Sequence, residues 1–428
     1  MDGAVDVRAG GADLEGRAYG RTQATPDQVL TQCGAGTPGG ELLRRYWQPL
    51  ALSSDATKFP VLVRILGEDL ILFRTGEGVP GLLYPRCMHR GTTLLYGRVD
   101  EKGIRCCYHG WLFAPDGEVL EMACEPGAAP KANARQPWYP LVERHGIIFT
   151  YMGPPEKQPA FPRFSVAEDL AEDETLVVRG GLRGFDLPDP NGVGAALAAD
   201  QDYNWWQFHD NVLDPFHLYW VHARLNGVQF VDTYGLLPKV AFEYTPDGVR
   251  SIQHRDVGGG RVHQRMGQAF LPNMNSITAL NDAVGFGGLG WTVPVDDTRF
   301  RTFFLSRMKR DGNPMAQFMD LGIFKGWGPG KPAGQWTLED HQTWQSDYVC
   351  QKGQGDITLH SEEHLSATDQ GLAMFRRMWR READKVAAGG DPIGVTFDEP
   401  YLFRTTAANA VLDAATMEAI EGPDGRKY

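Results

Sequence analysis

YPRCMHRGTT (residues 84–93) and RCCYHGW (residues 105–111) are the two stretches that decide how this chain folds. Together they supply four potential metal ligands, spaced as Cys-x-His and Cys-x-x-His: Cys87, His89, Cys106 and His109. Two thiolates on one iron and two imidazoles on a second iron form the ligand set of a mixed Cys/His [2Fe–2S] cluster. Gly91 and Gly110 let the backbone turn tightly around such a cluster. The spacing therefore predicts an iron–sulfur site held by two turns.

A structural zinc site built from the same four side chains is the main alternative, because tetrahedral Zn²⁺ accepts them. Zinc fingers usually pair Cys with Cys and His with His at other spacings. The alternation of Cys and His in each pair favours the iron–sulfur cluster.

The sequence around these stretches predicts a small all-β domain. Short strand-like pieces separated by Gly- and Asp-bearing turns extend from Phe59 to about Gly153, after an amphipathic helix near residues 42–47. The proline-rich segment 154–164 is typical of a linker, and the remainder mixes helical and strand patterns. We expect three units: a mobile N-terminal arm (1–27), an iron–sulfur domain with its leading helix (28–155) and an α+β domain (156–428).

A second group of ligands lies in DYNWWQFHDNVLDPFHLYWVHAR (residues 202–224). Two histidines and a carboxylate form a facial triad that leaves positions open on Fe(II). On an ideal helix His217 and His222 would point about 140° apart, so shared ligation requires a π-bulge or a distorted turn. Asp214 lies three residues before His217, where its carboxylate could accept the other imidazole N–H.

Taken together, the two groups resemble the oxygenase (alpha) component of Rieske non-haem iron aromatic oxygenases, in particular the phthalate dioxygenase and vanillate O-demethylase type. The second cluster loop of that family commonly reads C-P-Y-H-G-W, and Cys107 replaces the proline here. We expect Cys107 and Cys124 to be buried free thiols. The family signature D/E-N-x-x-D-x-x-H-x-x-x-x-H is matched by Asp210, Asn211, Asp214, His217 and His222.

The third iron ligand is expected to be a carboxylate far downstream. The candidates are Asp340, Asp347, Asp356 and Asp369. We favour Asp369, because the segment 362–381 resembles the E-H-L-x-x-S-D-x-G-V-x-x-x-R-R stretch whose aspartate ligates iron in phthalate-type oxygenases. The alternative for Asp369 is a plain first-turn acid stabilised by the helix dipole.

The resemblance implies an all-β Rieske [2Fe–2S] domain followed by an α+β, helix-grip-like catalytic domain with mononuclear Fe(II). It assigns the catalytic positions to Asp214 and Asn211, with Asp214 bridging a cluster histidine of one subunit to an iron-ligand histidine of its neighbour, and hence a homotrimer. The implied substrates are O₂ and an aromatic acid, with O-demethylation of a methoxylated acid favoured over cis-dihydroxylation of the ring. A Rieske electron-transfer protein without catalytic iron is a remote alternative.

Composition agrees with this interpretation. The formal net charge of −12 argues against nucleic acid as a partner, and no apolar stretch is long enough for a membrane span. No glycine-rich loop suited to a nicotinamide or flavin is evident, so we expect electrons from a separate NADH-dependent reductase with a flavin or ferredoxin component. The N-terminus has no secretory pattern, and six cysteines in 428 residues do not resemble a disulfide scaffold, so we expect a cytoplasmic protein.

Overall fold

The computed structural model describes residues 23–420, except 126, 128–133, 169, 185–199, 226, 230, 279–286, 311–327 and 332–334. Most of the predicted N-terminal arm, residues 1–22, lies outside this part. The end of the arm does not match the prediction of mobility, because the Thr25 amide donates to Ser361 Oγ at 2.8 Å and Asp27 forms an ion pair with Arg380. These contacts fix residues 25–27 against the C-terminal half.

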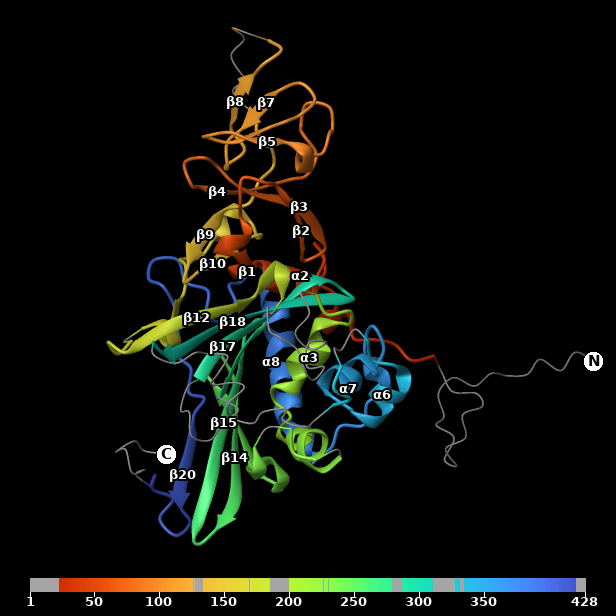
Figure 1. Cartoon of the computed structure of the whole chain (residues 1–428), viewed down its shortest axis with the longest axis vertical. Helices are drawn as coiled ribbons and strands as arrows, with labels where there is room; N and C mark the ends of the chain where they lie inside the picture. Colours follow the sequence, from red (N-terminus) through yellow and green to blue (C-terminus); the bar gives the residue numbers. More distant parts are fainter. Residues whose placement is uncertain are drawn as a thin grey trace, which may run out of the picture.

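The first part of the chain forms three small antiparallel sheets, as the all-β prediction requires. In order they are β1–β10–β9, β2–β3–β4 and β5–β6–β7–β8 (Figure 1). The strands are β1 (Gln48–Leu52), β2 (Val61–Ile65), β3 (Glu68–Arg74), β4 (Pro80–Leu83), β5 (Arg98–Val99), β6 (Ile104–Arg105), β7 (Trp111–Phe113), β8 (Val119–Met122), β9 (Leu141–Arg144) and β10 (Ile147–Thr150). The last of these sheets forms one tip of the molecule.

The second part is organised around an antiparallel sheet that has eight strands within the described residues. Its order is β12–β18–β17–β16–β15–β14–β13, and β20 pairs with β15. The strands are β12 (Glu174–Gly180), β13 (Lys239–Thr245), β14 (Gly248–Gly258), β15 (Arg261–Phe270), β16 (Met274–Thr278), β17 (Gly287–Asp296), β18 (Arg299–Lys309) and β20 (Asn409–Asp413), with β11 (Arg163–Phe164) and β19 (Leu402–Phe403) paired separately.

The long helix α8 (Gln370–Ala387) packs against β13 and β14 of this sheet. A side chain at Gly371 would overlap the ring of Phe242, so the helix approaches the sheet closely there. Phe375 and Trp379 are buried, as the predicted apolar face of this helix requires. This pairing of one long helix with a curved antiparallel sheet confirms the predicted helix-grip-like α+β fold.

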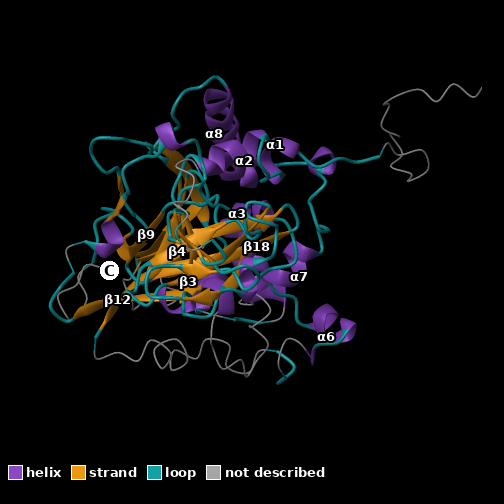
Figure 2. Cartoon of the chain, turned by 90° about the horizontal axis from the view of Figure 1, so that it is seen from above, coloured by secondary structure: helices purple, strands orange, loops and turns teal. Residues whose placement is uncertain are grey.

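The predicted leading helix is present as α2 (Pro38–Arg44), with α1 (Gln28–Thr31) before it, but it ends before Tyr46 and Trp47, which the prediction included. Both pack against α8, and Figure 2 shows the three grouped on one side of the sheets. The Trp379 indole donates to the Val29 carbonyl at 3.3 Å, and Tyr46 Oη donates to the Ile393 carbonyl at 2.6 Å. The apolar face of the leading helix therefore covers part of the C-terminal half, although it precedes the iron–sulfur domain in the chain.

The remaining helices lie away from α8 in sequence and form the second ligand region. They are α3 (Trp205–Asn211), α4 (Pro215–Tyr219), a π-helical turn (Trp220–Leu225), α6 (Leu338–Thr343) and α7 (Asp347–Lys352). Among the described residues, we find no helix with both the length and the apolar character needed to cross a membrane.

Replacing Trp379 by alanine tests the packing of α8. The side chain is fully buried, so Trp379→Ala should lower the free energy of unfolding by about 3–5 kcal/mol. Arg377→Ala, at an exposed position of the same helix, is the control and should change it by less than about 0.5 kcal/mol. Urea unfolding followed by far-ultraviolet circular dichroism measures both. If both substitutions lowered the free energy of unfolding equally, the buried face assigned to α8 would be wrong.

Candidate metal centres

The two Cys/His loops have the same backbone hydrogen bonds. In the first, the Cys87 amide donates to the Thr92 carbonyl at 2.9 Å and the Gly91 amide donates to the Cys87 carbonyl at 2.8 Å. In the second, the Cys106 amide donates to the Trp111 carbonyl at 2.8 Å and the Gly110 amide donates to the Cys106 carbonyl at 3.1 Å. Both glycines adopt positive φ, 76° and 72°, which favours glycine at these positions. The sequence thus builds two matching loops that face each other.

The four predicted cluster ligands come together between these loops. Cys87 and Cys106 are buried in the small apolar core of the tip, and the rings of His89 and His109 are 4.6 Å apart between centroids. His89 also stacks on Trp111, with centroids 4.8 Å apart. Burial raises the pKa of the Cys87 thiol to about 11, so a bound metal is needed to hold this side chain as a thiolate. Two buried sulfurs and two partly exposed imidazoles fit a Rieske cluster.

Two other cysteines of this region differ from the prediction. Cys107 and Cys124 are free, but they are exposed and not buried. The reason is that neither side chain packs into the small apolar core of the tip, and Cys124, just after β8, donates from Sγ to the His109 carbonyl at 3.4 Å. Neither lies among the cluster ligands.

The second ligand group consists of His217, His222 and Asp347, whose ligand atoms all lie within 4.8 Å of one another. Asp347 Oδ1 is 3.2 Å from His222 Nε2 and 3.8 Å from His217 Nε2. Two neutral imidazoles and one carboxylate are the donor set of a 2-His-1-carboxylate iron site. The structure thus brings the two predicted histidines together at one carboxylate.

The local helix geometry solves the spacing problem posed by these histidines. Pro215 is the first residue of α4 and separates it from α3, and Asp214 caps α4 by accepting from the Phe216 and His217 amides. His222 then lies in the π-helical turn 220–225. The wider turn brings the two rings to 5.2 Å between centroids, which confirms the predicted π-bulge.

The second nitrogen of each imidazole has a hydrogen-bond acceptor that fixes the ring. His222 Nδ1 donates to Gln229 Oε1 at 2.7 Å, and Gln229 is anchored by its amide on the Val221 carbonyl. His217 Nδ1 donates to the backbone carbonyl of Asp214, whereas the carboxylate Oδ2 is 3.7 Å away. The predicted acceptor role thus belongs to the carbonyl of Asp214, because its carboxylate is engaged at the helix cap. Neither the spacing nor the resemblance identified Gln229.

Asp347 is held by the packing of α7 on α3. Tyr203 Oη donates to Gln351 Oε1 at 2.6 Å, and Gln207 Nε2 donates to the Gln351 carbonyl at 2.7 Å. Burial opposes ionisation of Asp347, but the adjacent His222 and His217 lower its pKa below the usual range. Asn211 Nδ2, 3.3 Å from Asp347 Oδ1 and 3.4 Å from His217 Nε2, holds the carboxylate beside the imidazoles.

Asp369, the favoured third ligand, does not take part in this group. Its carboxylate accepts from the Ser366 amide at 2.7 Å and the Ser366 hydroxyl at 3.1 Å, in the capping box of the 3₁₀ turn Ala367–Asp369 that leads into α8. The structure therefore replaces Asp369 by Asp347 as the carboxylate of the triad. A capping side chain that turns back on its own helix start cannot reach another helix.

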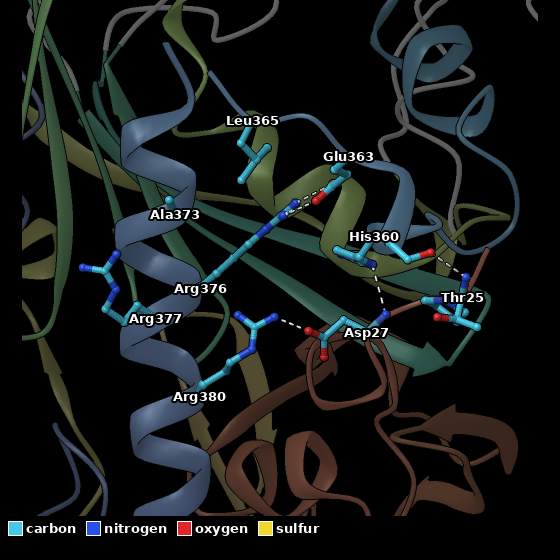
Figure 3. Close-up of a pocket in the computed structure, with 11 residues that line it drawn as sticks. Thr25, Asp27, His360, Glu363, Leu365, Ala373, Arg376, Arg377 and Arg380 are labelled. Atoms are coloured by element: carbon cyan, nitrogen blue, oxygen red, sulfur yellow. Dashed lines mark hydrogen bonds and ion pairs between the residues drawn. The ribbon is translucent and has the colours of Figure 1, made fainter. Parts of the chain in front are cut away.

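The segment that suggested Asp369 instead lines a cavity of about 670 Å³ beside α8. There Arg376 binds both Glu363 and the buried carboxylate of Asp210, and Figure 3 shows Arg376 turned toward Glu363. Burial raises the pKa of Asp210 to about 6 despite the neighbouring guanidinium. The cavity is thus lined by Arg376, which binds Asp210, the residue before Asn211. Its lining contains none of the three triad residues.

Comparison with known proteins agrees with this geometry. Residues 46–135 match the Rieske [2Fe-2S] domain family. The phenoxybenzoate dioxygenase subunit alpha of Ectopseudomonas oleovorans is 46% identical over 91% of this chain and 92% of its own. The chain belongs to the Rieske aromatic oxygenases. It carries a [2Fe–2S] cluster and a mononuclear iron.

More distant relatives of this oxygenase have related names. The 5,5'-dehydrodivanillate O-demethylase oxygenase subunit of Sphingobium sp. is 30% identical over 93% of this chain and 90% of its own. Among solved structures, NdmA of Pseudomonas putida CBB5 has a TM-score of 0.62 at 17% identity, covering 85% of this chain and 100% of its own. Dicamba monooxygenase has a TM-score of 0.57 at 20% identity, covering 81% and 99%. These two structures share the fold.

Exchanging single carboxylates tests the triad. Asp347→Asn should remove the mononuclear iron, because it replaces an anionic ligand by a neutral amide, and should leave the cluster intact. Iron and acid-labile sulfide assays should then fall from about three irons and two sulfides per chain to about two irons and two sulfides. Asp369→Asn is the matched control and should keep all three irons. The reverse pattern would restore Asp369 as the ligand.

Proposed function

We propose that this terminal oxygenase hydroxylates an aromatic carboxylate, with O₂ and with electrons from an NADH-dependent reductase that has a flavin or ferredoxin component. The triad of His217, His222 and Asp347, in a chain that also holds a Rieske cluster, is the observation that carries the proposal. Relatives named for aromatic acids support the substrate class, among them the phthalate 4,5-dioxygenase oxygenase subunit of Pseudomonas putida, 26% identical over 86% of this chain. We place the enzyme in the cytoplasm.

Two reactions fit this proposal. The Asp210–Asn211 pair resembles the vanillate-demethylase branch and favours O-demethylation, in which one oxygen atom enters a methoxy carbon and formaldehyde leaves. The relative named as a phenoxybenzoate dioxygenase is 46% identical, against 30% for the relative named as an O-demethylase. This difference favours dioxygenation of the ring of an aryloxy-substituted acid, and we keep O-demethylation as the alternative.

The residues of the second site have separate roles in this proposal. When bound, the cluster carries single electrons and the mononuclear iron activates O₂. Gln229 and the Asp214 carbonyl keep each imidazole with its Nε2 facing Asp347. Asn211 donates to Asp347 from the other side, so the amide limits the rotation of the carboxylate.

A second copy of the chain completes the site in this proposal. Within one chain the cluster loops lie at the tip of the molecule, away from α3 and α7 (Figure 1). The Asp214 side chain is one-third exposed beside His217, so another subunit can reach it. We propose a homotrimer in which a cluster histidine of one subunit, His89 or His109, contacts Asp214 of its neighbour.

A product assay distinguishes the two reactions. With a reductase and ¹⁸O₂, a phenoxybenzoate should acquire two labelled oxygens, and diphenyl ether, which lacks the carboxylate, should be a much poorer substrate. Formaldehyde from a methoxybenzoate, with one labelled oxygen incorporated, would favour the O-demethylase. If diphenyl ether matched the acid, the aromatic-carboxylate assignment would be wrong.

Asp214→Asn tests the bridging role. The amide keeps an oxygen for the cap of α4, so both metals should remain bound, but the loss of charge should reduce turnover about 10- to 100-fold. Metal content, cluster reduction by the reductase and product formation are measured together. Asp232→Asn, at an exposed position, is the control. Full activity of Asp214→Asn would rule out the bridge.

A further inference from the structure

Gln136 is a fully buried side chain that belongs to neither ligand pattern and yet binds the first cluster loop. Its Nε2 donates to the Tyr84 carbonyl at 2.9 Å and to the Arg86 carbonyl at 2.8 Å. Its Oε1 accepts from the Met88 amide at 2.8 Å. Both amide hydrogens and the oxygen are therefore used, and all three partners flank Cys87.

The backbone around Gln136 is held in place on both sides. The Gln136 amide donates to the Gly117 carbonyl at 2.8 Å, and a β-carbon at Gly117 would collide with the Gln136 carbonyl. On the other side, the Tyr84 amide donates to the Pro137 carbonyl at 2.8 Å, and Trp138 forms an isolated antiparallel bridge with Leu83. The side chain therefore extends from a fixed strand-like segment into the loop.

The three amides that follow Cys87 have different acceptors. Burial raises the pKa of the Cys87 thiol and backbone hydrogen bonds from the His89 and Arg90 amides oppose that shift, whereas the Met88 amide donates to Gln136. Hydrogen bonds to the cluster sulfurs stabilise the more negative, reduced state and raise the reduction potential. The orientation of this short run of backbone thus determines how many donors the sulfur receives.

The second cluster loop is held differently. Arg105 Nη1 donates to the Gly110 carbonyl at 2.8 Å, and the same guanidinium pairs with Asp100 and Glu121 at the surface. The first loop is thus held by a neutral buried amide and the second by a partly exposed ion-pair network. Because Gln136 is uncharged and buried, its hydrogen bonds to the first loop should not depend on salt or pH, unlike the ion pairs that hold the second loop.

We propose that Gln136 is a positioning residue of the Rieske centre: it orients the first cluster loop so that the His89 and Arg90 amides face Cys87 Sγ, and it thereby sets the reduction potential. The proposal rests on the cluster and not on the substrate or reaction proposed above. Its test therefore needs no turnover.

Gln136→Met keeps the length of the side chain and removes all three hydrogen bonds. The ratio of reduced to oxidised cluster, measured at the wild-type midpoint in a spectroscopic redox titration of the full chain, should fall about tenfold, which is 59 mV for one electron. The electron paramagnetic resonance spectrum of the reduced cluster should broaden, because the loop takes several orientations. Mononuclear iron should stay bound.

Gln48→Met is the matched control. Gln48 is equally buried and makes two hydrogen bonds, to the Leu43 carbonyl at 3.0 Å and from Asn273 at 2.9 Å, away from the cluster loops. Gln48→Met should lower the free energy of unfolding by an amount similar to that of Gln136→Met and leave the reduction potential of the cluster unchanged. An unchanged potential in both variants, or an equal shift in both, would overturn the proposal.

Gln136→Glu covers the case in which Gln136→Met retains no cluster. The carboxylate preserves the shape and the acceptor for the Met88 amide, but it faces the Tyr84 and Arg86 carbonyls without donors. The proposal predicts a cluster with a potential below that of the wild type, because the buried charge adds to the loss of donors. A wild-type potential in Gln136→Glu would show that Gln136 only fills space.

Discussion

The contact of one carboxylate, Asp347, with the imidazoles of His217 and His222 constrains the whole catalytic half of this oxygenase. A buried carboxylate is costly unless charge or hydrogen bonds compensate it. Here two imidazoles and the amide of Asn211 surround it, so three helices have to meet at one point. The seating of α7 on α3 through Gln351, and the interruption at Pro215, follow from that requirement.

The two metal sites are built by different means. The cluster site consists of two turns whose backbone hydrogen bonds are the same and whose glycines have positive φ, so local geometry places most of the donors. The triad depends on helices that are distant in the chain and on buried amide side chains such as Gln229. Electron carriage needs a rigid, nearly symmetrical cradle, whereas O₂ chemistry needs open positions beside three ligands.

Several elements followed from local patterns. The strands at 61–65 and 68–74 follow from short apolar runs bounded by turns, and the buried face of α8 follows from helical periodicity. The π-turn at 220–225 could be inferred because two histidines five residues apart cannot share an ion on a regular helix. The exposure of Cys107 and Cys124 could not be inferred from the sequence, because which side of a loop faces solvent depends on what packs against that loop.

The amino-acid sequence was sufficient to predict which side chains would gather at each site, namely two Cys/His pairs and one pair of histidines, because the members of each pair lie close together in the chain and their spacing is a property of the local backbone. Which carboxylate joins the two histidines was decided by the tertiary structure. Asp347 and Asp369 both lie at the start of a downstream helix, and they differ in what their carboxylates contact. Asp347 contacts two imidazoles, whereas Asp369 accepts from Ser366. Gln136 and Gln229 act only through folded contacts, so no pattern along the chain marks them.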